Sequence, residues 1–214
     1  MSERLSNALS VRLASRADAL CIAQMSRLHV ELGVGWSWRP ERVLHAIRAA
    51  DCVVLGAYPA IPANPQARGP GLEPPTDART DARTDASTRG DPVPPEPVGQ
   101  AGMPSGPASQ RGPVGFAIMR FGVEEAHLLL LCVAPRFRRQ GVAAALLRWL
   151  ESAALTAGVS IVRLEQRADN PIARRFYTQQ GFCYVRRRRG YYAGRIDALE
   201  LAKDLWDRTV PDGP

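Results

Sequence analysis

The chain has 214 residues and a mass of 23.3 kDa, which is enough for one domain with a real hydrophobic core. It carries 28 Lys and Arg against 21 Asp and Glu, a net charge of +7, and contains no apolar run of about 18 residues, so we expect no membrane span. The first twenty residues lack an apolar segment followed by a small-residue cleavage site, so we expect no secretory signal and a cytoplasmic protein.

The cysteines and histidines are widely spaced and form no CxxC pair. We therefore expect free thiols in a reducing compartment, no disulfide and no metal site. These residues are Cys21, Cys52, Cys132 and Cys183, together with His29, His45 and His127.

The positive charge first suggests a nucleic-acid ligand. However, the arginines gather in a short loop at Arg136, Arg138 and Arg139 and in the run Arg186–Arg189. A run of charges on a strand alternates between faces, so half of the second group is expected to be solvated. An acidic small ligand accounts for part of the excess, and we expect no direct DNA binding.

The N-terminal part predicts a short strand, two helices and a second strand. Ser15 and Asp18 are spaced like a capping box, and Gly33 and Gly35 follow the first helix. The apolar residues assigned to that helix are Leu20, Ala23, Met25, Leu28 and Leu32. The expected elements are a strand at Val11–Leu13, helices at Arg16–Leu32 and Pro40–Ala50, and a strand at Cys52–Tyr58.

The segment from Pro59 to Pro113 differs in character from the rest. It holds 13 of the 18 prolines, no aromatic residue, and a tandem tetrapeptide starting at Thr76, Thr80 and Thr84. Such a composition cannot bury enough apolar surface to offset the entropy of ordering it. We predict a disordered Pro/Gly-rich insertion at about 59–113, within a single domain spanning residues 1–214.

The C-terminal part predicts five strands and two helices. The second helix has Asp169 or Asn170 as its cap, Pro171 at its first position and Gly181 after its end. The strands are Val114–Arg120, His127–Val133, Ile161–Arg167, Phe182–Arg187 and Ala198–Leu205, and the helices are Gly141–Ala157 and Pro171–Gln180. The full order is β-α-α-β-β-β-α-β-α-β-β, which predicts an α/β (α+β mixed) fold with helices on both faces of a mixed sheet.

The stretch from Cys132 to Glu151 combines a buried strand, a basic loop and a helix that starts with small residues. The unpaired N–H groups of a helix start form an anion site, and small side chains let a ligand approach the backbone. Neither GxxxxGK[ST] nor GxGxxG is present, which excludes the two common nucleotide loops. The remaining pattern is R-x-x-G-x-A at Arg138, Gly141 and Ala143, and it predicts a seat for a pyrophosphate.

This pattern resembles the acetyl-CoA motif of the GNAT superfamily of N-acetyltransferases, and the chain is most similar to the ribosomal-protein-alanine (RimI-type) group. Four blocks carry the resemblance, with a looser match over the first 58 residues. The most diagnostic one is LE-x-R-x-x-N from Leu164 to Asn170, followed by a helix with Phe176 and Tyr177 and then by Gly-Phe. The blocks are EEAHLLLLCVAP, RRQGVAAALLRWL, RLEQRADNPIARRFYTQQGF and RRGYY. The resemblance implies a mostly antiparallel central sheet.

The resemblance also implies acetyl-CoA as co-substrate, no metal, and a monomeric enzyme that acetylates an N-terminal α-amine. The acceptor implied is the N-terminal peptide, starting with alanine, of a small-subunit ribosomal protein. Glu165 corresponds to the base, directly or through one water, and Tyr177 to the acid that protonates the CoA sulfur. The residues implied to bind the cofactor are Leu131, Cys132, Val133, Arg138, Arg139, Gln140, Gly141, Val142, Ala143, Ala144 and Asn170.

Several alternatives stay open. Glu165 is also placed to pair with a neighbouring arginine, Tyr177 to pack on the sheet, and Glu125 to act as a second base. Tyr191 and Tyr192 line a peptide slot or pack a hairpin. The acceptor could be another amine, such as lysine, a polyamine or an antibiotic, and a non-catalytic CoA- or RNA-binding module is the alternative from another class.

Overall fold

The computed structural model describes residues 9–59 and 112–207. The predicted insertion at about 59–113 lies almost wholly outside the described residues, as do the first eight residues. The elements in chain order are β1 (Leu9–Leu13), the 3-10 turn η2 (Arg16–Asp18), α1 (Ala19–His29), α2 (Pro40–Arg48), β2 (Cys52–Pro59), β3 (Gly115–Phe121), β4 (Glu125–Val133), the 3-10 turn η4 (Pro135–Phe137), α3 (Val142–Thr156), β5 (Ile161–Arg167), α4 (Pro171–Gln179), β6 (Cys183–Tyr192) and β7 (Ile196–Asp204).

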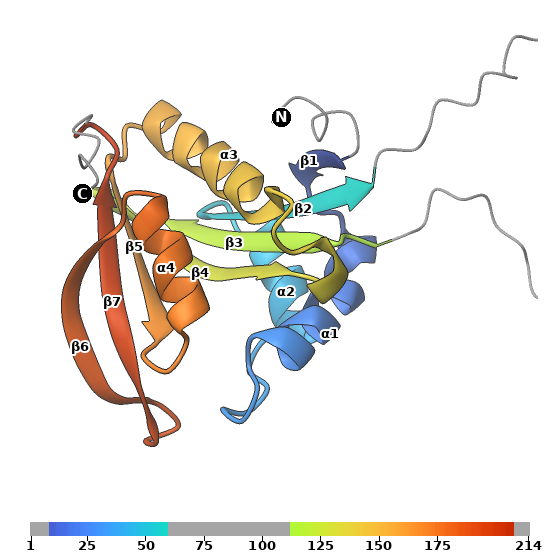
Figure 1. The fold of residues 1–214 in the computed structure, drawn as a ribbon. Coiled ribbons are helices and arrows are strands. Elements are labelled where there is room, and N and C mark those ends of the chain that lie inside the picture. The colour runs from blue at the N-terminus through green and yellow to red at the C-terminus, as the bar shows by residue number, and fades with distance from the viewer. Residues whose placement is uncertain (1–8, 60–111, 208–214) are drawn as a thin grey trace, which may run out of the picture. The chain divides into compact units, whose positions relative to one another are not determined.

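The seven strands form one sheet in the order β1-β2-β3-β4-β5-β7-β6 (Figure 1). Every neighbouring pair is antiparallel except β4 and β5, which run parallel. A parallel pair needs a crossover connection, and α3 supplies it. The predicted element order and the mixed, mostly antiparallel sheet are therefore confirmed.

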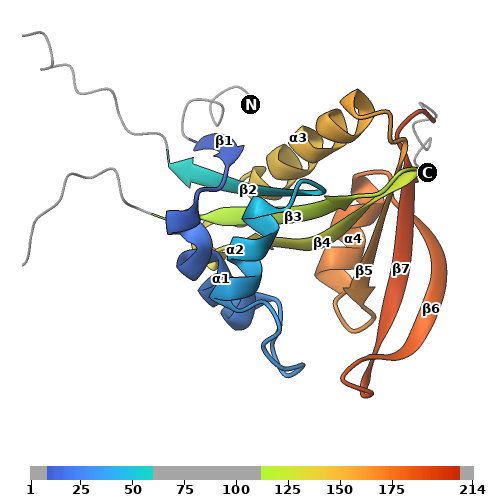
Figure 2. The same ribbon diagram turned by 180° about the vertical axis from the view of Figure 1, so that it is seen from behind.

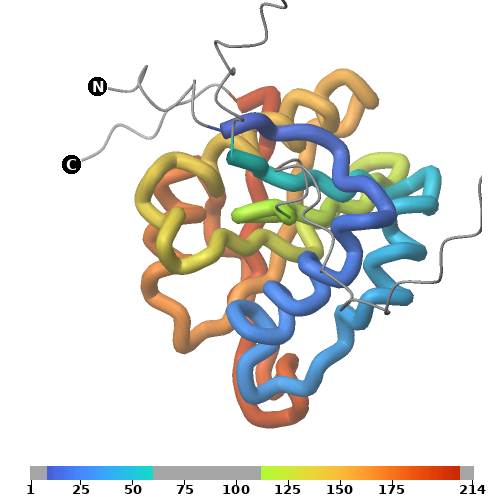
Figure 3. The backbone as a smooth tube through the Cα atoms, turned by 90° about the vertical axis from the view of Figure 1, so that its right-hand side faces the viewer, coloured from blue at the N-terminus to red at the C-terminus, as the bar shows by residue number. Residues whose placement is uncertain are grey.

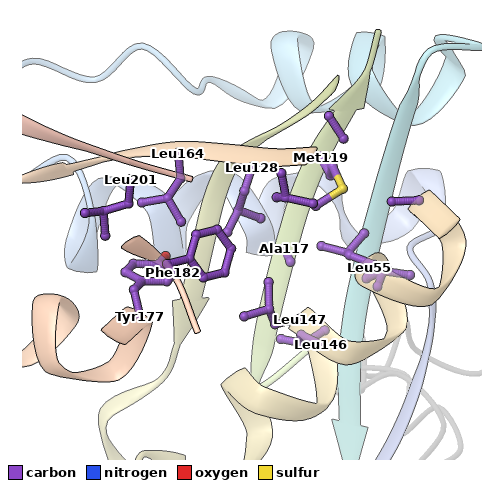
Figure 4. Packing of buried hydrophobic residues seen from close by; sticks show 14 of the residues in the cluster. Leu55, Ala117, Met119, Leu128, Leu146, Leu147, Leu164, Tyr177, Phe182 and Leu201 are labelled. Atoms are coloured by element: carbon purple, nitrogen blue, oxygen red, sulfur yellow. The ribbon is translucent and has the colours of Figure 1, made fainter. Parts of the chain in front are cut away.

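Two helices cover each face of the sheet, as the front and back views show (Figures 1 and 2). On one face α3 buries Leu146, Leu147 and Leu150 completely against the sheet. Figure 4 shows this core extending to the side chains of α4 and of β5. On the other face α1 and α2 bury Ile22 and Val43 in a second cluster. The sheet thus separates two cores.

Helix α1 differs from the predicted helix in its length and in its buried face. It ends at His29, and Leu20, Leu28 and Leu32 are each more than half exposed. The buried positions are Ala19, Ile22, Ala23, Met25 and Ser26. Four of these follow the i, i+3, i+4, i+7 spacing of a helix face, which the larger leucines do not. The buried face of α1 thus follows the helical spacing of small and β-branched residues and not the positions of the leucines.

Other boundaries shift by a few residues. Helix α2 ends two residues before the predicted limit, and α3 begins one residue after Gly141, which serves as its N-cap. Strand β6 continues to Tyr192, because its pairing with β7 resumes at Tyr192 and Ile196 after an irregular stretch. The four cysteines are free, as predicted. Among the described residues, no helix combines the length and apolarity needed to cross a bilayer.

Strand β4 contains a bulge that reverses its alternation. Ile118 pairs with Leu130 while the next residue, Met119, pairs with Leu128, so Leu129 is the extra residue. Before the bulge Leu128 packs in the α3 core, and after it Leu130 packs in the α1 core. Both strand halves thus bury apolar side chains, but toward opposite faces.

The bulge also marks the point where β4 and β5 separate. Their parallel pairing runs from Glu125 with Ile161 to Leu128 with Leu164 and then stops. Beyond that point β4 continues to Val133 and β5 to Arg167 without pairing to each other, and Figure 1 shows the two strands diverging. The sheet is therefore open between the C-terminal ends of its two central strands.

Candidate active site

The loop that leaves β4 delivers the chain to the start of α3. Gly141 is the N-cap with φ +78°, a left-handed conformation that glycine adopts without strain. A β-carbon at Gly141 would meet no atom within 4 Å, so the space above the helix start is open. Ala145 donates the first bond of the helix to the Gly141 carbonyl at 2.9 Å. The preceding N–H groups, including those of Val142, Ala143 and Ala144, lack helical acceptors, which makes this end an anion site.

The arginines of the loop have different roles. The Nε atom of Arg138 donates to the carbonyl of Val133 at 3.0 Å, which ties the loop to the end of β4. Arg139 is exposed and has a φ of 61°, unusual for a residue with a side chain. The side-chain amide of Gln140 donates to the Arg136 carbonyl at 2.9 Å. The exposed arginines add positive charge next to the helix start.

The predicted cofactor-binding end of β4 comprises Leu131, Cys132 and Val133, all beyond the last pair with β5. Cys132 is buried, and its Sγ atom lies 3.9 Å from the Met25 carbonyl in the α1 core. Burial raises the pKa of this thiol to about 12, so it stays protonated and is a poor nucleophile. Any contribution of these residues to a ligand between the strands comes from their backbone groups.

Gln166, on β5, is a buried polar side chain without a partner. It is 5% exposed, and within residues 9–59 and 112–207 neither its amide nitrogen nor its amide oxygen finds a hydrogen-bond partner. It shares the buried face of β5 with Val162 and Leu164, the face that packs under α3 and α4. Buried amides are nearly always paired, so an orphaned one next to the open end of the sheet indicates room for a polar ligand.

Helix α4 begins and ends as predicted from its cap and its glycine. The side-chain oxygen of Asn170 accepts from the Ala173 N–H at 3.0 Å, which caps the helix and leaves the amide NH2 group to donate elsewhere. Tyr177 is 9% exposed and packs edge-on against Phe176 and Phe182 (Figure 4). Its burial, and secondarily its neighbour Tyr192, raise the pKa of its phenol, so the hydroxyl is protonated at neutral pH.

Glu165 points to the opposite face of β5 and is the centre of a charged network. Its side chain is 9% exposed. Oε2 lies 2.6 Å from Nε2 of His127, and Oε1 accepts from Nη1 of Arg188 at 2.8 Å. Burial raises the pKa of this carboxyl group, but the hydrogen bonds and charges of His127 and Arg188 outweigh it and leave the pKa below its ordinary value. Glu165 is therefore ionised at neutral pH.

Glu125 occupies a different place. It starts β4 opposite Ile161, four residues before Glu165, which corresponds to roughly 13 Å along the strand. Its carboxylate pairs with Nε of Arg163. Both line a hollow of about 390 Å³ with Val185, Arg186 and Glu200, a set that does not include Glu165. The second candidate base thus lies at the far end of the parallel ladder from the open end of the sheet.

Two connections border the Glu165 side of that opening. The α1–α2 connection and the β6–β7 hairpin lie next to each other at the same end of the sheet (Figures 1 and 3). Nη1 of Arg167 donates to the Leu32 carbonyl at 2.6 Å and so joins β5 to the first connection. From the hairpin, the Tyr192 hydroxyl donates to the Glu165 carbonyl at 3.2 Å, and the Tyr191 ring lies under Arg188, 4.5 Å from its guanidinium carbon.

The α1–α2 connection is fixed by one carboxylate. Glu31 accepts from the N–H and the hydroxyl of Ser37, from the Trp38 N–H and from the Ser26 hydroxyl. The indole of Trp36 donates to the Ala23 carbonyl at 3.2 Å. Five side-chain bonds therefore hold this border of the site in one conformation.

The chain was compared with known protein families, and residues 98–182 match the family model described as the acetyltransferase (GNAT) family. This segment of the chain is therefore similar to GNAT acetyltransferases. Among curated relatives, it is 39% identical over 90 residues to the [ribosomal protein bS18]-alanine N-acetyltransferase of Escherichia coli (strain K12). That match covers 41% of this chain and 61% of the relative, so the chain spans less than two thirds of the relative's length.

Solved structures share the fold of this chain. The ribosomal-protein-S18-alanine N-acetyltransferase from Escherichia coli superimposes with a TM-score of 0.59 at 19% identity, over 92% of this chain and 94% of that one. Arabidopsis thaliana NAA60 in complex with acetyl-CoA gives a TM-score of 0.61 at 15% identity, over 92% and 98% of the two chains. At these identities the likeness concerns the fold alone.

The structure brings together two residues, His127 and Arg188, that were not assigned to the site from the sequence. His127 was treated only as one of three scattered histidines, and Arg188 only as a member of a basic run. Both contact Glu165 through distant positions, 38 and 23 residues away along the chain. The one usable signal was the strand period, since His127 and Glu165 both occupy the less buried alternate positions of two neighbouring strands. Among the described residues, no three His, Cys, Asp or Glu side chains gather as a metal site.

Proposed function

We propose that this protein is an acetyl-CoA-dependent N-acetyltransferase that acetylates a protein N-terminal α-amine. The observation that carries the proposal is the opening between β4 and β5. An anion site built from the start of α3 lies on one side of it, and the ionised carboxylate of Glu165 lies on the other. This arrangement can hold a phosphorylated donor and an amine acceptor on opposite sides of a reacting carbonyl.

The donor fits the residues that face the α3 side. The N–H groups of the first turn of α3, with Arg139 and Gln140 beside them, would hold the pyrophosphate. The backbone of Leu131 to Val133 would bond the pantetheine amides, and the NH2 group of Asn170 is free to donate. The orphaned amide of Gln166 offers both a donor and an acceptor in the same region. When bound, acetyl-CoA supplies a thioester carbonyl that an amine can attack.

The proton chemistry divides between the two faces of β5. On the acceptor side, Glu165 and its partners would receive the proton that the ammonium must lose before attack. On the other side, the buried phenol of Tyr177 would protonate the departing thiolate. Its raised pKa keeps the proton in place until a strong base, such as a thiolate in an apolar site, forms beside it.

The acceptor class follows from the availability of the free amine. An α-amine has a pKa of about 8 against about 10.4 for lysine, so much more of it is unprotonated at neutral pH. The curated relative's name gives alanine of ribosomal protein bS18 as its substrate. We extend this to the present chain and propose a peptide starting with alanine from a small-subunit ribosomal protein, modified in the cytoplasm by a monomeric enzyme.

A thiol-release assay with acetyl-CoA tests this function. Three peptides of the same sequence are compared: one with a free N-terminal alanine, one with that amine blocked, and one blocked but carrying an internal lysine. We expect CoA release only with the first. Release only with the lysine peptide would replace the proposed acceptor, and binding of CoA without release from any amine would indicate a non-catalytic module.

A further inference from the structure

His127 and Glu165 form a close pair at the edge of the β4–β5 opening. Nε2 of His127 lies 2.6 Å from Oε2 of Glu165, and the two side chains are 30% and 9% exposed. His127 is opposite Arg163 in the parallel ladder, one position before the last pair. The imidazole therefore lies nearer to solvent than the carboxylate does, on the face where the acceptor is proposed to enter.

Glu165 is poorly suited to take a proton itself. One carboxylate oxygen accepts from Arg188 at 2.8 Å and the other is engaged by His127. A carboxylate with a permanent cation on one oxygen and a hydrogen-bond donor on the other is stabilised in its charged form. The same contacts lower its pKa. Proton transfer to Glu165 would break both interactions in a nearly buried place.

The pairing also decides which nitrogen of His127 is available. If Nε2 carries the proton that it donates to Glu165, Nδ1 keeps a lone pair. No hydrogen bond from Nδ1 to another residue occurs within residues 9–59 and 112–207. A carboxylate behind an imidazole fixes its tautomer and stabilises the imidazolium when the other nitrogen gains a proton. Imidazole changes its charge between about pH 5 and pH 8, which suits an acceptor amine at neutral pH.

The charged groups around the pair leave this role intact. The Arg188 guanidinium is held by Glu165 and stacks on Tyr191. Arg163, the ladder partner of His127, pairs with Glu125 and with Glu200. From the hairpin, Tyr192 contributes a hydroxyl that bonds the Glu165 backbone and not its carboxylate. The two neighbouring cations thus have anionic partners of their own.

We propose that His127 accepts the proton of the acceptor ammonium at Nδ1, with Glu165 as the carboxylate that orients and compensates it. This inference rests on the proposed function. The ammonium N–H bond breaks and its proton moves to Nδ1, directly or through a water. The freed amine forms a C–N bond with the thioester carbonyl carbon, the C–S bond breaks, and the thiolate takes the Tyr177 proton. The new amide nitrogen loses its extra proton to solvent, and the Tyr177 phenolate regains a proton from solvent. His127 then returns its proton to solvent.

His127→Gln separates this role from a structural one, because glutamine can still donate to Glu165 but cannot carry the proton. We expect kcat/KM at pH 7 to fall roughly 100- to 1,000-fold, the usual contribution of a general base. The deficit should shrink as the pH rises above the pKa of the peptide amine, about 8, because a free amine needs no base. His45→Gln, in an exposed position of α2, serves as the matched control and should keep wild-type turnover.

A second variant keeps the test valid if glutamine disturbs the fold. His127→Ala is assayed with added imidazole and with substituted imidazoles of different pKa. We expect the lost turnover to return in part, with a rate that follows the basicity of the added imidazole. CoA affinity, measured by calorimetry, should equal that of the wild type for both variants, which verifies folding.

The outcomes distinguish the inference from the function on which it rests. If the wild-type protein transfers acetyl to the peptide and His127→Gln does so equally well at pH 7, His127 is not the acceptor. A deficit that is constant from pH 6.5 to 9.5 and unaffected by imidazole would reduce His127 to a positioning residue for Glu165. If the wild-type protein itself releases no CoA with any amine, the proposed function fails, and the inference fails with it.

Discussion

Glu165 and Gln166 are consecutive residues of β5, but their side chains differ in whether they have hydrogen-bond partners. Glu165 has an arginine and a histidine on its carboxylate, while the amide of Gln166 has no hydrogen-bond partner among the residues that the structure describes. Both are nearly buried, so the difference does not come from solvent. It comes from the alternation of the strand, which sends one side chain toward the hairpin and the other under α3 and α4.

The contrast extends to the two faces of the site. Toward α3, the groups available to a ligand are backbone N–H and C=O groups and one orphaned amide, so recognition there needs few particular side chains. Toward the hairpin, the chemistry depends on side chains from three strands, β4, β5 and β6, that meet only in the folded chain. Under the proposed function, one face holds the ligand and the other moves the proton.

The largest expected effect comes from removing the charge of Glu165. We expect Glu165→Gln to lower kcat/KM roughly 100- to 10,000-fold at pH 7 while leaving the affinity for CoA unchanged, because Glu165 faces away from the α3 side. Thiol release and calorimetry measure the two quantities. Glu125→Gln, the matched carboxylate at the far end of the parallel ladder, should keep most of the activity. An equal loss in both variants would contradict the separation of the two glutamates.

The α3 face is tested at its helix start. Gly141→Ala places a side chain at a φ of +78°, which we expect to cost about 1–2 kcal/mol of unfolding free energy, since left-handed backbone disfavours L side chains. The site above it has room, so any loss of CoA affinity arises from the backbone moving and not from a clash. Urea unfolding and CoA titration measure both. Unchanged stability would show that the loop relaxes without strain.

Gln166→Leu tests the side chain next to Glu165, on the opposite face of β5. Replacing an unpaired buried amide with an apolar side chain of similar size should raise the unfolding free energy by about 1 kcal/mol. If CoA provides the missing partner, the gain should decrease or reverse at saturating CoA, because the ligand then stabilises only the wild-type amide. Unfolding in urea with and without CoA tests this. A gain of the same size in both conditions would mean that the amide does not contact the cofactor.

The smallest expected effect is the pH dependence contributed by Glu165. Its pKa in the folded protein lies below the ordinary value of 4.5, so its contribution to stability is fully present above that value. The contribution is lost as the pH falls through the lowered folded pKa. The difference in unfolding free energy between wild type and Glu165→Gln should therefore decrease as the pH falls below about 4.5. A difference that grows below this pH would reverse the assigned sign.

The fold was predictable from local patterns. Strand β5, with its buried alternate residues, and α4, with its asparagine cap, proline and following glycine, each carry their signals within a dozen residues. The errors occurred where burial depends on distant partners. The sequence predicted a buried face that included Leu20, Leu28 and Leu32. In the structure these leucines are exposed, and Ile22 and Ala23 are buried instead. Strand β6 was predicted to end at Arg187, but it continues to Tyr192 because it pairs with β7.

The site was predictable only in part, for the same reason. The helix start at Gly141 and the cap at Asn170 are local and were found. Their roles toward acetyl-CoA, like those of Glu165 and Tyr177, come from resemblance and stay predictions. The pairing of His127 with Glu165 depends on the parallel register of β4 and β5. A short sequence motif does not predict that register, because the two residues are 38 positions apart.

The extra residue at Leu129 shifts the alternation of side chains in β4 by one position. Upstream of it, even-numbered residues face α3, and downstream they face α1. If Leu129 stayed in the strand and paired regularly, Leu130, Leu131, Cys132 and Val133 would each exchange faces, whereas deleting this leucine would leave all four on the faces they now occupy. The bulge, and not the side chains themselves, therefore determines which of the two cores each of these residues joins.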